Sequence, residues 1–127
     1  MKKDMDLIRT ILLKIEEVYI DTAIYDLEID NYDNKTVAYH CKLLNNAGFI
    51  SDYGAQFADD ELWSFGVGSL TWEGHEFLDK IRDDTVWNKT KTTILDNGLP
   101  MILDVVKNVS TTIISSMTEG AIRAINK

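Results

Sequence analysis

The sequence contains one cysteine, one proline and two histidines among its 127 residues. With Cys41 as the single cysteine, an internal disulfide and a cysteine-rich zinc site are excluded. The most apolar region, 99–117, is interrupted by Asp104, Lys107 and Asn108 and is not a membrane span. The first nine residues carry too many charges for the apolar core of a secretion signal. We therefore expect a cytoplasmic protein with no membrane segment.

Positive charge is also scarce. The chain has 13 Lys and Arg against 21 Asp and Glu, a formal net charge of −8. Non-specific affinity for nucleic acid comes mainly from basic side chains that neutralise phosphates. The composition therefore argues against a general nucleic-acid binder and favours basic partners.

Apolar residues recur every three or four positions between Asp4 and Tyr19, which predicts a helix with Asp4 or Asp6 as its N-cap. Alternating apolar and acidic residues over 25–29 predict a half-buried strand. Asp33 is then the expected N-cap of a second helix, which ends at Gly48.

The following residues predict a hairpin and a third helix. A strand opens at Phe49, residues 54–61 form a loop, and 62–71 is the returning strand. Thr71 or Ser69 begins a helix over 72–83. Helix, strand, helix, hairpin, helix is the order of a winged helix. We therefore predict an α+β, mainly helical fold with a winged-helix-like domain over 1–83.

Residues 84–127 are expected to form a C-terminal helical extension. Residues 85–95 predict one helix, and Pro100 suits the first turn of a long last helix. That helix carries a broad apolar stripe, which either folds back on the domain or dimerises. We favour a homodimer. The expected oligomerisation residues are Ile102, Val106, Val109, Ile113 and Met117.

Several motifs resemble known families. VAYHCKLLNNAGFI at 37–50 and SLTWEGHEFL at 69–78 resemble the recognition helix and the post-wing helix of winged-helix repressors. Longer motifs resemble a domain-of-unknown-function family of phages, prophages and Gram-positive bacteria. They are MKKDMDLIR at 1–9, Tyr39-His40, AGFI at 47–50, LTWEGHEFLD at 70–79 and IRDDTVWNKTK at 81–91. Members tend to have Leu at the positions of Cys41 and Phe49. The resemblance implies the host's bacterial cytoplasm as the location if a phage encodes the chain.

A DNA-reading role would depend on the exposed face of the second helix. The candidate residues there are Thr36, Tyr39, His40, Lys42 and Asn45, whose side chains can bond to base edges. Against this role, residues 51–71 contain no Lys or Arg. Residues 51–83 hold eight acids and two bases, a net charge of about −6. The helix that crosses the DNA backbone in such domains is also missing.

No pattern supports catalysis, a cofactor or a metal. There is no phosphate-binding glycine loop and no nucleophile motif. His40 and Cys41 are adjacent on a helix and point about 100° apart, so they do not form a metal site together. Cys41 is expected on the buried face as a small hydrophobe. Trp63 and Trp72 are expected in the core, whereas Trp87 covers the junction with the extension or faces a partner.

Our leading expectation is a non-enzymatic, phage- or prophage-type interaction module. It would bind a protein through the acidic hairpin at Asp59, Asp60, Glu61 and Trp63, with a host-modulating or counter-defence role. One alternative is a DNA-binding transcriptional regulator. A second alternative is a phage assembly component.

Overall fold

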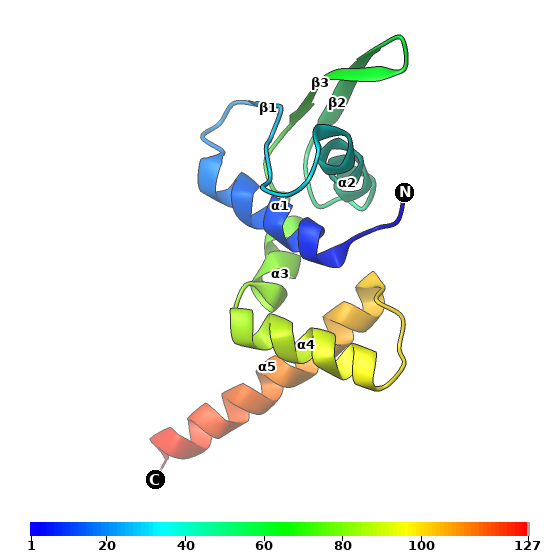
Figure 1. Ribbon diagram of the computed structural model, residues 1–127. Coiled ribbons are helices and arrows are strands. Elements are labelled where there is room, and N and C mark those ends of the chain that lie inside the picture. Colours follow the sequence, from blue (N-terminus) through cyan, green and yellow to red (C-terminus); the bar gives the residue numbers. More distant parts are fainter. Residues whose placement is uncertain (127) are drawn as a thin grey trace. The chain divides into compact units, whose positions relative to one another are not determined.

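A computed structural model describes residues 1–126. Five helices and three strands lie in these residues (Figure 1). In chain order they are α1 (Met5–Val18), β1 (Ile24–Tyr25), α2 (Asn34–Asn46), β2 (Tyr53–Ala58), β3 (Glu61–Val67), α3 (Trp72–Ile81), α4 (Asp84–Asp96) and α5 (Leu103–Ile125). The predicted mainly helical α+β class and the winged-helix-like order are confirmed. The chain forms two compact units that divide between Leu78 and Asp79, inside α3.

Helix α1 supplies much of the core of the first unit. Asp4 is its N-cap, and the Asp4 carboxylate accepts a hydrogen bond from the Leu7 N–H at 3.1 Å. This bond satisfies a backbone donor that the helix itself cannot use. One apolar face of the helix is fully buried, at Leu7, Ile11, Leu12 and Ile15. The three-and-four spacing in the sequence therefore corresponds to the buried face.

The sheet is antiparallel with the strand order β1-β3-β2. The strand predicted over 25–29 is wrong, because β1 ends at Tyr25. Asp26 has φ +52° and leaves the strand conformation. Leu27 and Ile29 are nevertheless buried. The alternation in the sequence thus arose from an irregular segment whose apolar side chains reach the core.

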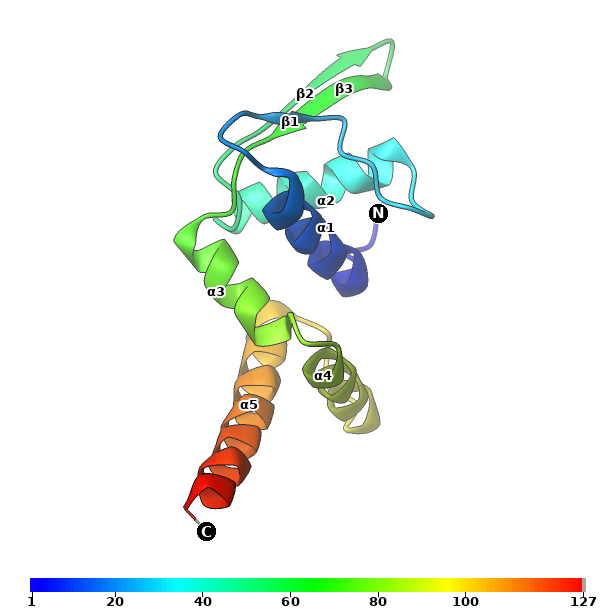
Figure 2. The same cartoon turned by 90° about the vertical axis from the view of Figure 1, so that its left-hand side faces the viewer.

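The hairpin extends further toward its turn than predicted, and its first strand begins at Tyr53 rather than at Phe49. Residues 54–61 are not a loop, since β2 continues to Ala58 and only Asp59 and Asp60 form the turn. Both turn residues have positive φ, 51° and 65°. A two-residue turn of this kind matches the twist of a hairpin, and Asp tolerates positive φ better than most residues. The returning strand ends at Val67 rather than at Thr71. The hairpin extends beyond α2 (Figure 2).

Hydrogen bonds and a ring contact join the end of α2 to the start of α3. Gly48 has φ +81° and ends α2. The Thr71 N–H donates to the Phe49 carbonyl at 3.0 Å, and the Thr71 hydroxyl bonds the Gly48 carbonyl. The same hydroxyl accepts from the Gly74 N–H at 3.0 Å, so Thr71 is the predicted cap. A Cβ at Gly74 would collide with the Phe49 carbonyl oxygen, and the rings of Phe49 and Phe77 stack at 5.0 Å.

In the second unit, α4 packs against the first part of α5. Asp83 caps α4 by accepting from the Val86 N–H at 3.0 Å. The prediction for Pro100 is wrong, because α5 begins at Leu103 after its N-cap Ile102. Pro100 lies in the connection between the two helices. At 23 residues against 13, α5 extends well past α4 (Figure 1).

Candidate functional site

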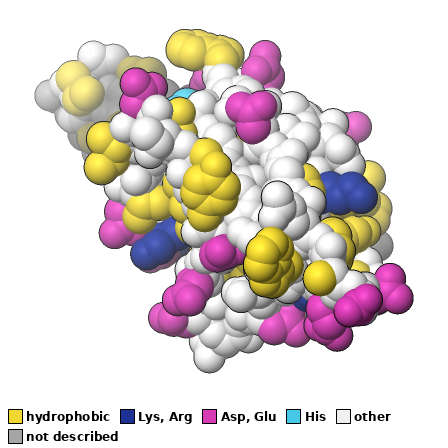
Figure 3. All heavy atoms as spheres, turned by 90° about the horizontal axis from the view of Figure 1, so that it is seen from above, with side chains coloured by type: hydrophobic (Ala, Val, Ile, Leu, Met, Phe, Trp, Pro, Cys, Tyr) yellow, Lys and Arg dark blue, Asp and Glu magenta, His cyan; other side chains and the backbone are white. Residues whose placement is uncertain are grey.

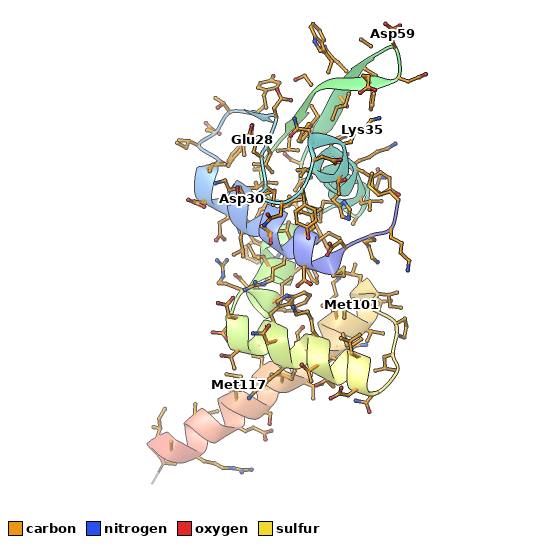
Figure 4. All side chains as sticks on the ribbon, in the orientation of Figure 1. Glu28, Asp30, Lys35, Asp59, Met101 and Met117 are labelled. Carbon is orange, nitrogen blue, oxygen red and sulfur yellow. The ribbon has the colours of Figure 1, made fainter. Side chains whose placement is uncertain are left out.

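The β2–β3 hairpin, here called the wing (Tyr53–Val67), presents three consecutive acids at its tip. Asp59 and Asp60 form the turn, and Glu61 pairs with Ala58. All three carboxylates are exposed, and Asp59 stands at the end of the hairpin (Figure 4). The wing sequence contains no Lys or Arg to neutralise them. The tip is therefore a concentrated negative surface on a two-residue turn.

Two large aromatic residues lie beside these acids. Trp63 is 75% exposed and Phe57 is 60% exposed. Gln56 pairs with Ser64 and Phe57 pairs with Leu62, so Trp63 is the extra residue of a β-bulge. A bulge turns its residue away from the regular alternation of a strand. Figure 3 shows hydrophobic and acidic side chains interspersed at this end of the unit.

Asp26 holds the base of the wing. Its carboxylate accepts from the Phe65 N–H at 3.0 Å and from the Ser64 hydroxyl at 3.3 Å. Its own N–H donates to the Phe65 carbonyl at 2.8 Å. The side chain of Asp26 thus continues the ladder after β1 has ended. Sequence reasoning assigned Asp26 only to the exposed side of a strand.

The face of α2 that was predicted to read DNA is largely committed to the fold. His40 is 1% exposed, so its prediction as a base-contacting residue is wrong. The Asn45 side-chain amide donates to the Ile50 carbonyl at 3.1 Å. The Thr36 N–H donates to Asp33 at 2.8 Å and the Thr36 carbonyl lies 2.8 Å from His40 Nδ1. Of the five predicted residues, Lys42 is exposed and Tyr39 is half-buried.

His40 belongs to a polar network at the N-terminus. The backbone N–H of Asp4 donates to His40 Nε2 at 2.9 Å, and His40 Nδ1 donates to the Thr36 carbonyl. The Tyr32 hydroxyl donates to the Asp4 carboxylate at 2.9 Å, and this bond raises the pKa of Tyr32. The network joins α1, the segment before α2 and α2 itself. His40 therefore has a structural role.

A hollow of about 540 Å³ lies between α2 and the wing. Ala55, Phe57 and Leu62 line it from the wing, and Tyr39 lines it from α2. Lys35 and Lys42 also border it, and both are exposed. Figure 4 shows Lys35 on α2 beneath the hairpin. An apolar hollow flanked by two ammonium groups suits an apolar ligand with a carboxylate or a phosphate.

The predictions for two of the three tryptophans are wrong. Trp63 and Trp72 were expected in the core, but each is 75% exposed. Trp87 is 2% exposed, so the alternative in which it faces a partner is wrong, and the Lys91 ammonium lies 5.4 Å from the centre of its ring. The bulge exposes Trp63, and Trp72 is the first residue of α3.

Cys41 is buried, whereas His75 is exposed beside an acidic residue. Burial raises the pKa of the Cys41 thiol to about 12, as befits a small hydrophobe. His75 Nδ1 lies 3.7 Å from the Glu16 carboxylate on α1. Within residues 1–126, no three His, Cys, Asp or Glu side chains form a group that could hold a metal ion. No helix in the described range has the length and hydropathy needed to cross a membrane.

The predicted oligomerisation residues divide into two groups. Val106 is fully buried within the single chain, so its assignment to an intermolecular contact is wrong. Val109 and Ile113 are half-buried. Met117 is 46% exposed and lines a hollow with Val86 of α4, and Ile102 is 45% exposed just before α5.

Comparisons with known proteins identify relatives without an assigned activity. A family described as "Hypothetical protein (DUF2513)" matches residues 2–100. An "Uncharacterized protein" of Haemophilus influenzae (strain ATCC 51907 / DSM 11121 / KW20 / Rd) is 45% identical over 118 residues, which cover 92% of this chain and 98% of the relative. No solved structure matches.

Proposed function

The chain belongs to the DUF2513 family, and we propose that it is a non-enzymatic module of phage or prophage type that binds a protein partner through the wing. The observation that carries the proposal is the 75% exposure of Trp63 beside three acids at the wing tip. Exposed tryptophans are costly in solution and are enriched among the residues that dominate binding energy in protein interfaces. The proposed host-modulating or counter-defence role follows from the phage-type resemblance of the motifs.

The chemistry of the wing defines the partner. Asp59, Asp60 and Glu61 favour a basic surface, and Phe57 and Trp63 provide apolar area next to them. Complementary charge accelerates encounter, whereas the buried aromatic anchor sets the lifetime of the complex. A basic surface with an apolar depression is therefore the expected binding site on the partner.

The test compares charge and aromatic variants that leave the turn intact. Positive φ at residues 59 and 60 makes lysine a poor substitution there, because it adds strain to the change of charge. The triple variant Asp59→Asn, Asp60→Asn, Glu61→Gln removes three charges and keeps residues that suit the turn. Trp63→Ala removes the aromatic anchor.

The wild-type chain and each variant are immobilised, and the host proteins that bind to each are identified. A host protein that binds the wild type should not bind either wing variant, and the circular dichroism spectra of the variants should match that of the wild type. The matched control Asp21→Asn, Glu28→Gln, Asp30→Asn removes three exposed acids outside the wing and should retain it. Equal retention by wild type and both wing variants would rule out the wing as the interface.

A DNA-binding regulator is the second candidate, and one observation favours it. Lys35, Tyr39 and Lys42 border a single hollow on α2. Gel-shift assays at low salt test this role, since electrostatic binding is strongest there. A shift that Lys42→Ala and Tyr39→Ala remove would support it, and the absence of a shift would count against it.

A further inference from the structure

The wing has an unpaired outer edge. In the order β1-β3-β2, strand β2 has a neighbouring strand on one side only. Phe65 on β3 directs both backbone groups toward Asp26, donating at 3.0 Å and accepting at 2.8 Å. The N–H and C=O of one strand residue point to the same side. Ala55, which lies opposite Phe65, therefore directs its N–H and C=O away from β3.

The same alternation applies to Tyr53 and Phe57, which are each two positions from Ala55. These three residues present three N–H and three C=O groups along one edge. No described residue forms a backbone hydrogen bond with them on that side. The edge thus offers the backbone donors and acceptors that one further strand would need.

Strand β2 also lacks the usual protection of an exposed edge. Natural edges are blocked by charged residues, by proline, by shortness or by a bulge in the edge strand. The six residues YGAQFA contain no charged residue and no proline. The bulge of this sheet lies at Trp63 on β3, so it leaves β2 regular. Because 27% of the residues in the chain are charged, the absence of charge from all six residues of β2 favours a role for this edge in binding.

Two hollows flank this edge. The hollow of about 540 Å³ lies on the α2 side, and a second of about 450 Å³ lies on the outer face of the sheet. Tyr53, Gly54 and Ala55 line both. Side chains of an added strand alternate between the two faces of a sheet. The hollow next to α2 would therefore receive every second side chain of such a strand, whereas the second hollow extends over β3 to Tyr25, away from the edge.

We propose that β2 binds an extended segment of a partner protein as a fourth strand, with an apolar side chain in the hollow next to α2 and a carboxylate near Lys35 and Lys42. The inference rests on the proposed function and specifies the form of the partner. Neither lysine forms a salt bridge within the described residues, so both ammonium groups are available. This mode takes affinity from main-chain hydrogen bonds and selectivity from the alternate side chains.

Charge disfavours a second copy of the chain as the occupant. Residues 1–78 contain six Lys and Arg and fifteen Asp and Glu, a net charge of −9. Pairing two β2 edges would bring two such units together, and each would carry its acidic wing tip into the contact. A partner segment with one carboxylate avoids this repulsion.

The first experiment selects binders from a random peptide library of about twelve residues, long enough to cover one strand. The most enriched peptide is then measured against two matched variants by fluorescence polarisation. Ala55→Pro removes one outward N–H and no bond to β3, whereas Ala55→Val adds a side chain of similar size and keeps the N–H. We expect Ala55→Pro to weaken binding at least tenfold and Ala55→Val to change it less than threefold. Equal binding by the two variants would overturn the proposal, as would the absence of an enriched peptide.

Hydrogen exchange of the complex provides an independent readout. The amides of Tyr53, Ala55 and Phe57 should become protected, and those of Gly54 and Gln56, which already face β3, should change little. Protection without this alternation would contradict strand addition. Self-association of the free chain that Ala55→Pro abolishes would instead show that a second copy occupies the edge.

Reversing the charge of the two lysines tests whether the bound segment places a carboxylate near them. Lys35→Glu with Lys42→Glu should weaken the enriched peptide at least tenfold, and replacing its acidic residue by lysine should restore binding. A peptide whose binding is weakened by Ala55→Pro but not by changes at Asp59, Asp60, Glu61 or Trp63 would support strand addition at β2 and contradict the wing-tip interface. The two proposals therefore fail separately.

Discussion

His40 Nε2 accepts a hydrogen bond from the backbone N–H of Asp4 at 2.9 Å, across 36 positions of the sequence. The acceptor role of Nε2 places the ring proton on Nδ1, which donates to the Thr36 carbonyl at 2.8 Å. The His40 imidazole thus satisfies a backbone donor at the start of α1 and connects α1 to α2.

Replacement of His40 by phenylalanine should destabilise the first unit. The variant keeps a planar ring but leaves the Asp4 N–H without its acceptor, at a cost of about 1–3 kcal/mol. Urea unfolding followed by circular dichroism measures the change. Tyr39→Phe, on the neighbouring half-buried residue, is the control and should unfold like wild type. An unchanged urea midpoint for His40→Phe would show that the bond contributes nothing.

The pKa of Asp33 should lie below the ordinary value for an aspartate. Hydrogen bonds from the side chain and backbone of Thr36 lower the pKa of Asp33 from 3.8. Because the folded-state pKa is depressed, the carboxylate stabilises the fold above about pH 3.8, and this contribution is lost as the pH falls through the lower folded-state value. Carboxyl NMR titration should show the pKa moving back toward 3.8 in Thr36→Val. Identical titration curves for the two proteins would exclude the Thr36 hydroxyl as a cause.

The Cys41 thiol should be unreactive in the folded protein. Its burial raises its pKa to about 12, so little thiolate forms near neutral pH. A disulfide reagent that releases a coloured thiol should react slowly with native protein and rapidly in guanidinium chloride. The double variant Cys41→Ala, Ala47→Cys moves the thiol to an exposed position and should react rapidly without denaturant. Rapid reaction of native wild type would contradict the burial.

The exposed apolar residues in the second half of α5 should mediate dimerisation. Met117 is 46% exposed, and Ile125, eight positions further along the same broad apolar stripe, is 80% exposed. Met117→Glu should raise the dimer dissociation constant at least tenfold in analytical ultracentrifugation, because a buried carboxylate is costly. Ser116→Glu places the same charge on the neighbouring exposed residue and should have a smaller effect. A monomeric wild type at high micromolar concentration would refute the homodimer.

The wing illustrates why part of the site was predictable and part was not. The acids at Asp59, Asp60 and Glu61 could be identified in the sequence because charge is local. The strand over 54–58 was missed because a run of Gly, Ala and Gln has little strand preference by itself. Pairing with β3 and the turn at Asp59 and Asp60 stabilise it. Exposure of Trp63 depends on a bulge, which requires two paired strands.

The sequence by itself determined most of the helices, the cap at Asp33 and the buried position of Cys41, and it reduced the caps of α1 and α3 to two candidates each, of which Asp4 and Thr71 are the ones used. These features depend on residues three or four positions apart, whose spacing is visible in one segment of chain. Only the tertiary structure decided that His40 turns inward, that Trp63 turns outward and that β2 ends the sheet with an unpaired edge. Each of these depends on which distant segment lies alongside, since burial and strand pairing arise between segments rather than within one.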